Sequence, residues 1–450
     1  MQANTRFSMI SDWETNLAPE APSAPGSLKE AGLPASFIYD LIVKTIYTRG
    51  PMLGRDIAQA LCLPFKIIHN PLKYLKDEKI IQVDGGELVG EISYRFSLTD
   101  FGRKRSEDAL RQCSYVGPAP VPLEDYVEQC YRQSVTGLQC FPETLKLPFG
   151  HLVLREELFN AIGPAIISGK SVFIYGPPGN GKTAIARSIG DFMNTAGGSI
   201  YVPHAFIADG NIVTVYDPSL HVVDNDIADD SLDADMAVKR LLGDDATDLR
   251  WVKIRRPVIV TGGELDLPML DLRYVEEAKF YQAPIHFKAN GGVFLIDDFG
   301  RQKCSVKDLL NRWILPLEDR HDFLTVASGK KFQVPFEQLI IFSTNLDPKS
   351  LVDDAFLRRM RHKVEILAPQ PEVYQKIFFS VCKKLGMNYD QASVEYLYEN
   401  YYNRGRTPRA SDCRDLLEIV QSICRYRRQP VHLSRDLIAE ASSSFIAEFQ

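Results

Sequence analysis

Residues 176–183 read GPPGNGKT, and this stretch decides the fold of the central part of the chain. It fits the pattern G-x-x-x-x-G-K-[ST], in which glycines let backbone N–H groups turn inward around an anion. SVFIY before it is typical of a buried strand, and TAIARSIGDFM after it has the apolar spacing of a helix. Because the positive end of that helix also attracts anions, we predict a phosphate-binding loop here.

Besides the backbone N–H groups of the loop, two of its side chains are expected to contact a nucleotide. Lys182 is expected to neutralise the β- and γ-phosphates, and Thr183 to supply an oxygen to Mg²⁺. A glycine-rich turn that matches the pattern by chance is the competing interpretation. The residues predicted to bind the nucleotide are Gly176, Pro177, Pro178, Gly179, Asn180, Gly181, Lys182, Thr183 and Ala184.

Residues 293–298 read VFLIDD, so an apolar run ends in Asp297 and Asp298. We expect this strand to lie beside the strand of the phosphate loop, with its acids near the metal. Asp297 is then a Mg²⁺ partner, and Asp298 polarises the attacking water. The alternative is a solvated strand end followed by a turn.

Strand-like and helical segments alternate between about residues 148 and 368. The strand-like runs are SVFIYG, SIYV, PVIV, VFLID and LIIFSTN. This alternation predicts an α/β fold with a parallel sheet and helices on both faces. From residue 371 the pattern is helical throughout, with Pro371 at the first helix start, Gly386 at its end and Ser434 as a later cap.

Together, GPPGNGKT, VFLIDD, LIIFSTN and the helical tail resemble the AAA+ ATPases over about residues 148–450. The resemblance implies a P-loop NTPase core at 148–368 and a helical lid domain at 369–450. It also implies that Asn345 orients the attacking water. In that family an arginine from the neighbouring subunit completes each site, and Arg359 matches it better than Arg358.

The resemblance extends to the lid and to one clade of the family. Arg409 is the candidate lid arginine that reaches the nucleotide, with Arg406 as the alternative. HFKANGG before the acidic strand, and a hairpin predicted from FLTV and KFQVP, resemble the MoxR-like, helix-2-insert and pre-sensor hairpin clade. The chain departs from the family in having Asp297-Asp298 where Asp-Glu is usual, which puts the reach of Asp298 to the water in doubt.

The remaining segments contain no functional motif, so only their general character can be predicted. We expect a disordered tail at 1–34 and a linker at 113–147. Residues 210–222 are typical of a hairpin strand, and the acidic stretch 222–235 of a solvated loop.

Residues 35–112 have the helix and hairpin pattern that resembles a winged helix-turn-helix domain. Twelve Lys or Arg against ten Asp or Glu give this segment a net charge of only +2, a weak footprint for DNA, and Pro71 interrupts its third helix. Docking of a protein partner therefore stays open beside DNA binding. The DNA-contact candidates are Lys66, His69, Asn70 and Lys73 on the third helix and Arg95 on the wing.

Composition narrows the class of protein. The chain of 450 residues carries a net charge of −6, so it is not a polyanion binder as a whole. No apolar run approaches the roughly 18 residues needed to span a bilayer. The eight cysteines form no CxxC pair, which argues against a zinc site or a disulfide scaffold and favours a cytoplasmic protein.

The sequence thus supports two hypotheses. The first is a Mg²⁺-dependent ATPase that assembles as a homo-oligomeric hexameric ring or spiral and remodels a macromolecular partner, with a protein client expected and DNA possible through the winged helix. The second is an ATP-regulated module that docks on DNA or a protein with little turnover.

Overall fold

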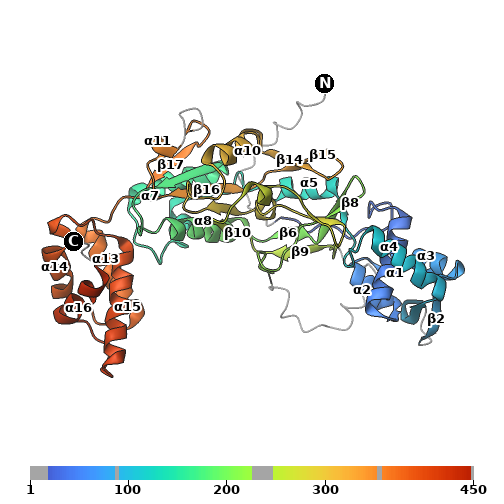
Figure 1. The fold of residues 1–450 in the computed structure, drawn as a ribbon, viewed down its shortest axis with the longest axis horizontal. Helices are drawn as coiled ribbons and strands as arrows, with labels where there is room; N and C mark the ends of the chain where they lie inside the picture. Colours follow the sequence, from blue (N-terminus) through green and yellow to red (C-terminus); the bar gives the residue numbers. More distant parts are fainter. Residues whose placement is uncertain (1–18, 87–90, 225–246, 352–356, 447–450) are drawn as a thin grey trace.

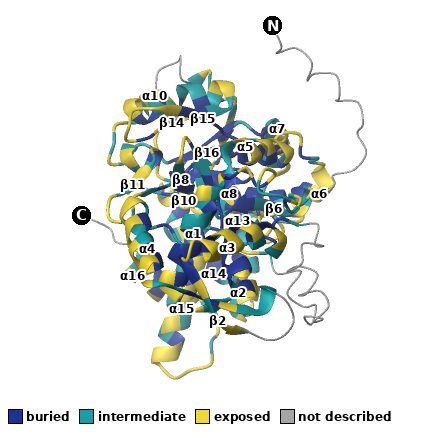
Figure 2. Cartoon of the chain, turned by 90° about the vertical axis from the view of Figure 1, so that its right-hand side faces the viewer, coloured by how far each residue is buried: buried dark blue, intermediate teal, exposed yellow. Residues whose placement is uncertain are grey.

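The computed structural model describes residues 19–86, 91–224, 247–351 and 357–446 of the chain. Figure 1 shows an elongated molecule with β-sheets in its middle, one group of helices at the N-terminal end and another at the C-terminal end. In Figure 2 the buried residues lie in the interior, and the exposed ones cover the outer sides of the helices.

The centre of the molecule is a five-stranded sheet in which every neighbouring pair of strands is parallel. The α/β fold with a parallel core is therefore confirmed. The spatial order of its strands is β10 (Val258–Thr261), β13 (Val293–Ile296), β16 (Leu339–Thr344), β5 (Ser171–Tyr175) and β17 (His362–Glu365).

Helices cover both faces of this sheet. Val293 and Leu295 of β13 pack in one cluster with α7 (Glu156–Ser168) and α8 (Lys182–Gly197). The alternate residues of β13 pack on the opposite face with α10 (Val306–Asp319). Because strands covered on both faces need apolar side chains at every position, these strands are continuous apolar runs.

Two expectations about strand placement are wrong. The run SIYV forms β6 (Ile200–Pro203), which pairs antiparallel with β9 (Trp251–Ile254) outside the central sheet, and β17 takes the fifth place. The acidic strand β13 also does not lie beside β5, because β16 separates them. An apolar run indicates that a strand is buried but contains no information about its lateral neighbours.

A second five-stranded sheet stands between the core and the N-terminal helices. The predicted hairpin strand near 210–222 is confirmed as β8, which pairs with β7. The acidic loop predicted at 222–235 falls largely outside the described residues. The order of this sheet is β11 (Arg273–Val275), β12 (Phe280–Gln282), β8 (Asn211–Thr214), β7 (Ala205–Ala208) and β4 (Val121–Pro122).

The linker predicted at 113–147 is wrong. β4 from this segment pairs with β7, and α5 (Leu123–Arg132) buries Tyr126 and Cys130 against the second sheet. α6 (Pro142–Lys146) packs beneath α7. Proline and cysteine content favoured a linker, but the apolar residues of the segment are part of the core.

The hairpin predicted before the Asn345 strand is present. β14 (His321–Thr325) and β15 (Lys331–Pro335) pair antiparallel over five residue pairs. α11 (Pro348–Leu351) follows β16, and short 3-10 helices lie at Glu91–Ser93, Leu267–Leu270, Phe287–Ala289 and Tyr402–Arg404.

The N-terminal part combines helices with a three-stranded antiparallel sheet of order β1-β3-β2. α3 continues through Pro71, whose ring is buried. The elements are α1 (Ala35–Arg49), β1 (Met52–Leu53), α2 (Gly54–Leu61), α3 (Phe65–Asp77), β2 (Ile81–Gly86), β3 (Tyr94–Leu98) and α4 (Asp100–Gln112).

The predicted disordered tail is wrong for residues 19–34, and residues 1–18 lie outside the described residues. Ala31 and Leu33 are buried in the N-terminal core. The buried guanidinium of Arg250 donates from Nη1 to the Ala31 carbonyl at 2.9 Å and is paired with Asp248 at 2.8 Å. Small residues lowered the apparent hydrophobicity of a segment that nevertheless packs.

The C-terminal part is helical, as predicted. Pro371 starts α13, Gly386 ends it, and the Ser434 hydroxyl accepts a hydrogen bond from Leu437 N at the start of α16. The helices are α13 (Pro371–Leu385), α14 (Gln391–Asn400), α15 (Ala410–Tyr426) and α16 (Arg435–Phe445).

Arg256 joins three parts of the central region. Its side chain is 3% exposed and donates to the carbonyls of Gln133 at 3.0 Å, Gly197 at 3.0 Å, Gly198 at 3.2 Å and Gly291 at 2.7 Å. Burial lowers the pKa of its guanidinium to about 10. Carbonyls alone therefore satisfy a buried cation that ties the 113–147 segment to α8 and to the start of β13.

Replacing Arg256 tests this junction. Arg256→Met should lower the free energy of unfolding by about 3 kcal/mol, because several buried carbonyls lose their donor. Chemical denaturation measures the change. Arg255→Met is the matched control, since Arg255 is exposed and its loss should cost less than about 0.5 kcal/mol. Equal stability of the two variants would contradict the role of Arg256.

Candidate functional site

The phosphate loop lies at the carboxyl end of β5 and leads directly into α8. Glycine is required at two of its positions. Gly179 has φ +81°, and a Cβ on Gly176 would lie 2.1 Å from the Ile366 carbonyl oxygen. The amide groups of the loop can therefore point at an anion only with these small residues in place.

Lys182 is the first residue of α8 and is only 7% exposed. Its ammonium donates to the carbonyls of Gly176 at 2.8 Å and Pro177 at 3.0 Å, and to Asn345 Oδ1 at 2.6 Å. Burial lowers the pKa of Lys182, and the charges of Asp297 and Asp298 oppose that shift. A polyphosphate bound here would supply further negative charge to this ammonium.

The acidic pair lies on the other side of the same site. Thr183 Oγ1 donates to Asp297 Oδ2 at 2.6 Å, and Asn345 Nδ2 donates to Asp298 Oδ1 at 2.8 Å. The structure therefore brings the phosphate loop, both acids and Asn345 into one hydrogen-bonded set.

This set forms although β16 separates β13 from β5. α8 packs across the sheet face against residues of β13 and β16, so its first turn points toward the end of β13. Thr183 therefore reaches Asp297 across one intervening strand. Asn345 follows the intervening strand itself, between the lysine and the second acid.

A cleft of about 540 Å³ surrounds these groups and is lined on one side by the helical C-terminal part. The sequence interpretation missed its remaining walls. The apolar positions of α13 indicated packing, whereas Ile377 and Val381 face the cleft, and the segment before α7 contains no motif. The additional lining residues are His151, Leu152, Val153, Leu154, Ile377, Ser380, Val381, Lys384, Ser411 and Arg414.

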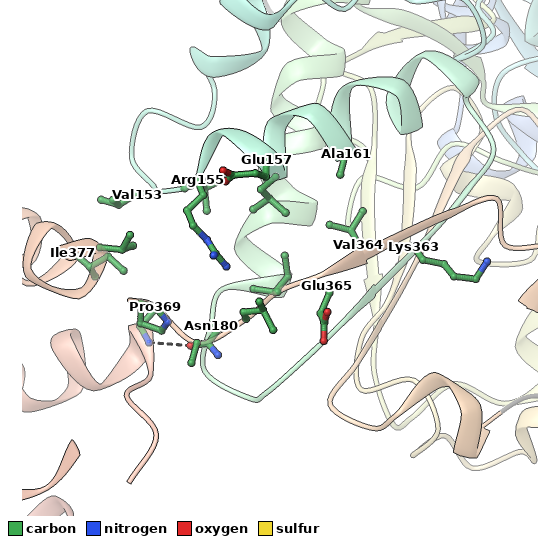
Figure 3. Close-up of a pocket in the computed structure, with 17 residues that line it drawn as sticks. Val153, Arg155, Glu157, Ala161, Asn180, Lys363, Val364, Glu365, Pro369 and Ile377 are labelled. Carbon is green, nitrogen blue, oxygen red and sulfur yellow. Dashed lines mark hydrogen bonds between the residues drawn. The ribbon is translucent and has the colours of Figure 1, made fainter. Parts of the chain in front are cut away.

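A second cavity of about 300 Å³ adjoins the cleft, and Figure 3 shows its lining. The two cavities share Val153, Leu154 and Asn180, among others. Figure 3 shows Arg155 extending into this space from the start of α7. Because most of the other lining side chains are apolar, the cavity can hold a flat, weakly polar group beside the phosphate loop.

The lid contacts the phosphate loop through main-chain groups at the start of α15. Ala410 N donates to Asn180 Oδ1 at 3.1 Å (Figure 3), and Ser411 N donates to the Gly179 carbonyl at 2.8 Å. Arg409 precedes these residues and lies beside Gly179, but its side chain is exposed and does not line the cleft.

The other lid arginines differ from Arg409 in their contacts. Arg406, the alternative, lies 3.3 Å from Asp412 within the lid. Arg414, which the sequence interpretation did not single out, lines the cleft.

Arg359 lies at the opposite edge of the sheet from the phosphate loop. Its carbonyl accepts from the hydroxyl of Ser171, the first residue of β5, at 3.2 Å, and its Nε donates to Glu318 at 2.5 Å. β5 spans five residues at roughly 3.3 Å each, so Arg359 and the phosphate loop are separated by about the length of the strand. Arg358 next to it is exposed.

The DNA-contact candidates lie on the surface of the N-terminal part. Lys66, Asn70, Lys73 and Arg95 are exposed. His69 is half-buried, and its Nε2 lies 2.6 Å from Glu91, so it is a weaker candidate than the sequence suggested.

The oxygen atoms of the site, and not a cluster of acidic, His or Cys side chains, are the possible metal ligands among the described residues. Within the described ranges, no cluster of three or more His, Cys, Asp or Glu side chains could hold a metal ion. The oxygens of Thr183 and Asp297 are hard ligands of the kind Mg²⁺ prefers, and Mg²⁺ ordinarily keeps waters and phosphate oxygens as its other ligands. In the same ranges, no helix is long and apolar enough to cross a membrane.

Comparisons with known proteins find one family match and several distant structural likenesses. Residues 370–444 match a family described as a domain of unknown function, DUF8689. The search of curated proteins gives no match. The family match covers α13–α16, the helical part that lines the cleft.

Three solved structures illustrate these distant likenesses. The Thermotoga maritima RuvB Holliday junction branch migration motor is 15% identical, with TM-score 0.35, covering 68% of this chain and 70% of that one. Brucella abortus NtrX is 12% identical, with TM-score 0.40 and coverages of 76% and 60%. Domain III of the Thermotoga maritima replication initiation protein DnaA is 14% identical, with TM-score 0.36 and coverages of 69% and 100%.

Proposed function

We propose that the chain is a Mg²⁺-dependent ATPase of the AAA+ type that acts on a macromolecular partner as a homo-oligomer. The observation that carries this proposal is the continuous set of contacts from Lys182 through Asn345 to Asp298, with Thr183 on Asp297 beside it. A phosphate loop alone would support only nucleotide binding. An acid and an amide aimed into the same cleft support hydrolysis.

Nucleotide binding divides between the two adjoining cavities. The loop amides, Lys182 and the positive end of α8 hold the phosphates, and the apolar cavity beside Leu154 accepts the base. Thr183 and Asp297 would hold Mg²⁺, which would neutralise charge on the phosphate oxygens. The Thr183 hydroxyl, now donating to Asp297, would turn its lone pairs to the metal.

Asp298 is the residue that acts on water in this proposal. Its carboxylate accepts a proton from a water placed between it and the γ-phosphate, while the Asn345 amide orients that water. Lys182 stabilises the negative charge that develops on the phosphate oxygens. The shorter side chain of Asp298, compared with glutamate, makes its exact distance from the water critical.

The position of Arg359 supports an oligomer. Because Arg359 lies at the amino end of β5, away from its own phosphate loop, a role in hydrolysis would require it to act at the site of another copy. In a ring or spiral it would stabilise charge on the γ-phosphoryl oxygens of the neighbour. Arg409 beside Gly179 would then report nucleotide binding to the lid.

The flanking parts support a role in remodelling a partner. The β14–β15 hairpin before β16 supports placement in the MoxR-like, pre-sensor hairpin clade, and the order of elements in 35–112 supports a winged helix domain. That domain would dock a protein client or DNA. This proposal includes a cytoplasmic location and a division into a winged-helix domain at 35–112, a nucleotide-binding domain at 148–368 and a lid domain at 369–450.

A second candidate function is an ATP-regulated docking module with little turnover. The pair Asp297-Asp298 in place of the usual Asp-Glu favours it, because the Asp298 carboxylate is one methylene shorter than that of glutamate and reaches less far toward the water.

Steady-state ATP hydrolysis separates the two functions. The wild type should turn over, Lys182→Ala should lose nucleotide binding, and Asp298→Asn should keep binding while turnover falls about 100-fold through loss of the base. Nucleotide affinity is measured in parallel with a fluorescent ADP analogue. If the wild type binds nucleotide but hydrolyses ATP only at the background rate, the docking module is favoured over the ATPase.

Mixing experiments test the role of Arg359. Arg359→Ala should bind ATP normally but hydrolyse it on the order of 10³-fold more slowly. Adding Lys182→Ala subunits, which retain the arginine, should restore part of the activity. Arg358→Ala is the matched control and should keep most turnover. Full activity of Arg359→Ala alone would contradict the assignment in trans.

A salt series tests DNA binding by the N-terminal part. If α3 contacts phosphates, affinity for duplex DNA should fall steeply with salt, and Lys73→Ala should reduce the log–log slope by about 0.9. Lys104→Ala on α4 serves as the control on a different helix. A flat salt response, or no binding at low salt, would leave protein docking as the role of this domain.

A further inference from the structure

The turn after β13 has an unusual backbone. Asp298 has φ +48° and Gly300 has φ +103°. A non-glycine residue in the left-handed region is uncommon, although Asp tolerates it better than most. The residue that is to act on water therefore stands on a backbone that its surroundings must hold in place.

Main-chain hydrogen bonds hold the two ends of this turn. Asp297 N donates to the Thr261 carbonyl at 2.7 Å, and Phe299 N donates to the Ser343 carbonyl at 2.7 Å. These bonds fix the turn to β10 on one side and β16 on the other. The main-chain carbonyl of Asp298 lies between them and accepts from Arg301 N at 3.0 Å, which closes the turn.

The side chain of Gln302 adds further hydrogen bonds to the same turn. Its Nε2 donates to the carbonyls of Asp297 at 3.1 Å and Asp298 at 3.2 Å, and its Oε1 accepts from Gly300 N at 2.8 Å. Since carbonyls can only accept and an N–H can only donate, a single orientation of the amide satisfies all three contacts. One half-buried side chain thus bonds to three main-chain groups of the turn, an arrangement that we call the Gln302 clamp.

The clamp matters because of where the Asp298 side chain points. Asn345 holds its carboxylate, and the Gln302 amide holds its carbonyl together with Arg301 N, so both ends of the residue are fixed. An aspartate has one methylene fewer than a glutamate with which to correct an error in backbone position. A displacement of about 1 Å at a reacting group can cost about 100-fold in rate.

We propose that Gln302 is a positioning residue for ATP hydrolysis, which acts by holding the Asp298 backbone at the distance that its short side chain requires. This inference rests on the proposed function, because it assigns Gln302 a part in turnover. Gln302 itself touches neither water nor nucleotide in this role. Its contribution passes through Asp298.

Gln302→Glu is the sharpest variant. It keeps the size of the side chain, but a carboxylate would face the carbonyl oxygens of Asp297, Asp298 and Gly262 and lose the bonds donated to them. The turnover number should fall about 10- to 100-fold. The affinity for Mg²⁺–ADP and the melting temperature should stay near the wild-type values, because the phosphate loop and the core are untouched.

Controls separate positioning from a general structural role. Lys303→Ala changes the exposed neighbouring residue and should leave turnover unchanged. If Gln302→Glu does not fold, Gln302→Ala removes the clamp without adding charge and should show the same selective loss. A fall in affinity and melting temperature together with turnover would overturn the positioning role.

A double-mutant cycle provides the decisive measurement. If Gln302 acts only through Asp298, Gln302→Glu should cause no further loss in an Asp298→Asn background. Additive losses would overturn the inference while leaving the ATPase intact. Normal turnover of Gln302→Glu would do the same. A wild type without turnover would instead overturn the proposed function, and the role of Gln302 with it.

Discussion

The site depends on how one buried ammonium is satisfied. Lys182 is surrounded by two loop carbonyls and the Asn345 oxygen, so its charge is stabilised without a direct ion pair to either aspartate. Asn345 then uses its amide nitrogen on Asp298. Through this one amide, the cation that would hold the phosphates and the acid that would act on water are fixed relative to each other. Such an arrangement is possible only at the edge where β5, β13 and β16 all end.

Local motifs could be predicted from the sequence because the residues of each motif determine its local structure by themselves. GPPGNGKT needs its glycines wherever it occurs, and VFLIDD and IIFSTN show where buried strands meet solvent. Pro371 and Gly386 bound a helix by their own backbone limits. These features were found at the expected positions.

Features that depend on distant contacts could not be predicted. The separation of β13 from β5 depends on the path of the whole chain, and Thr183 reaches Asp297 only because α8 crosses the sheet. The 113–147 segment has the composition of a linker, but the carbonyl of its Gln133 accepts a hydrogen bond from the buried Arg256. Cleft residues such as Leu154 and Val381 resemble ordinary apolar residues, because a wall of a cavity has the same composition as a core.

Because α15 is attached to the phosphate loop, a movement of the loop would be transmitted along this helix. Ser411 N is bonded to the carbonyl of Gly179, so the first turn of α15 follows the backbone of the loop. The helix contains 17 residues and is therefore about 25 Å long. A rotation of about 10° at its first turn would move its far end by roughly 4 Å over that length. A small rotation at the phosphate loop would therefore become a displacement of several ångströms at the far end of α15.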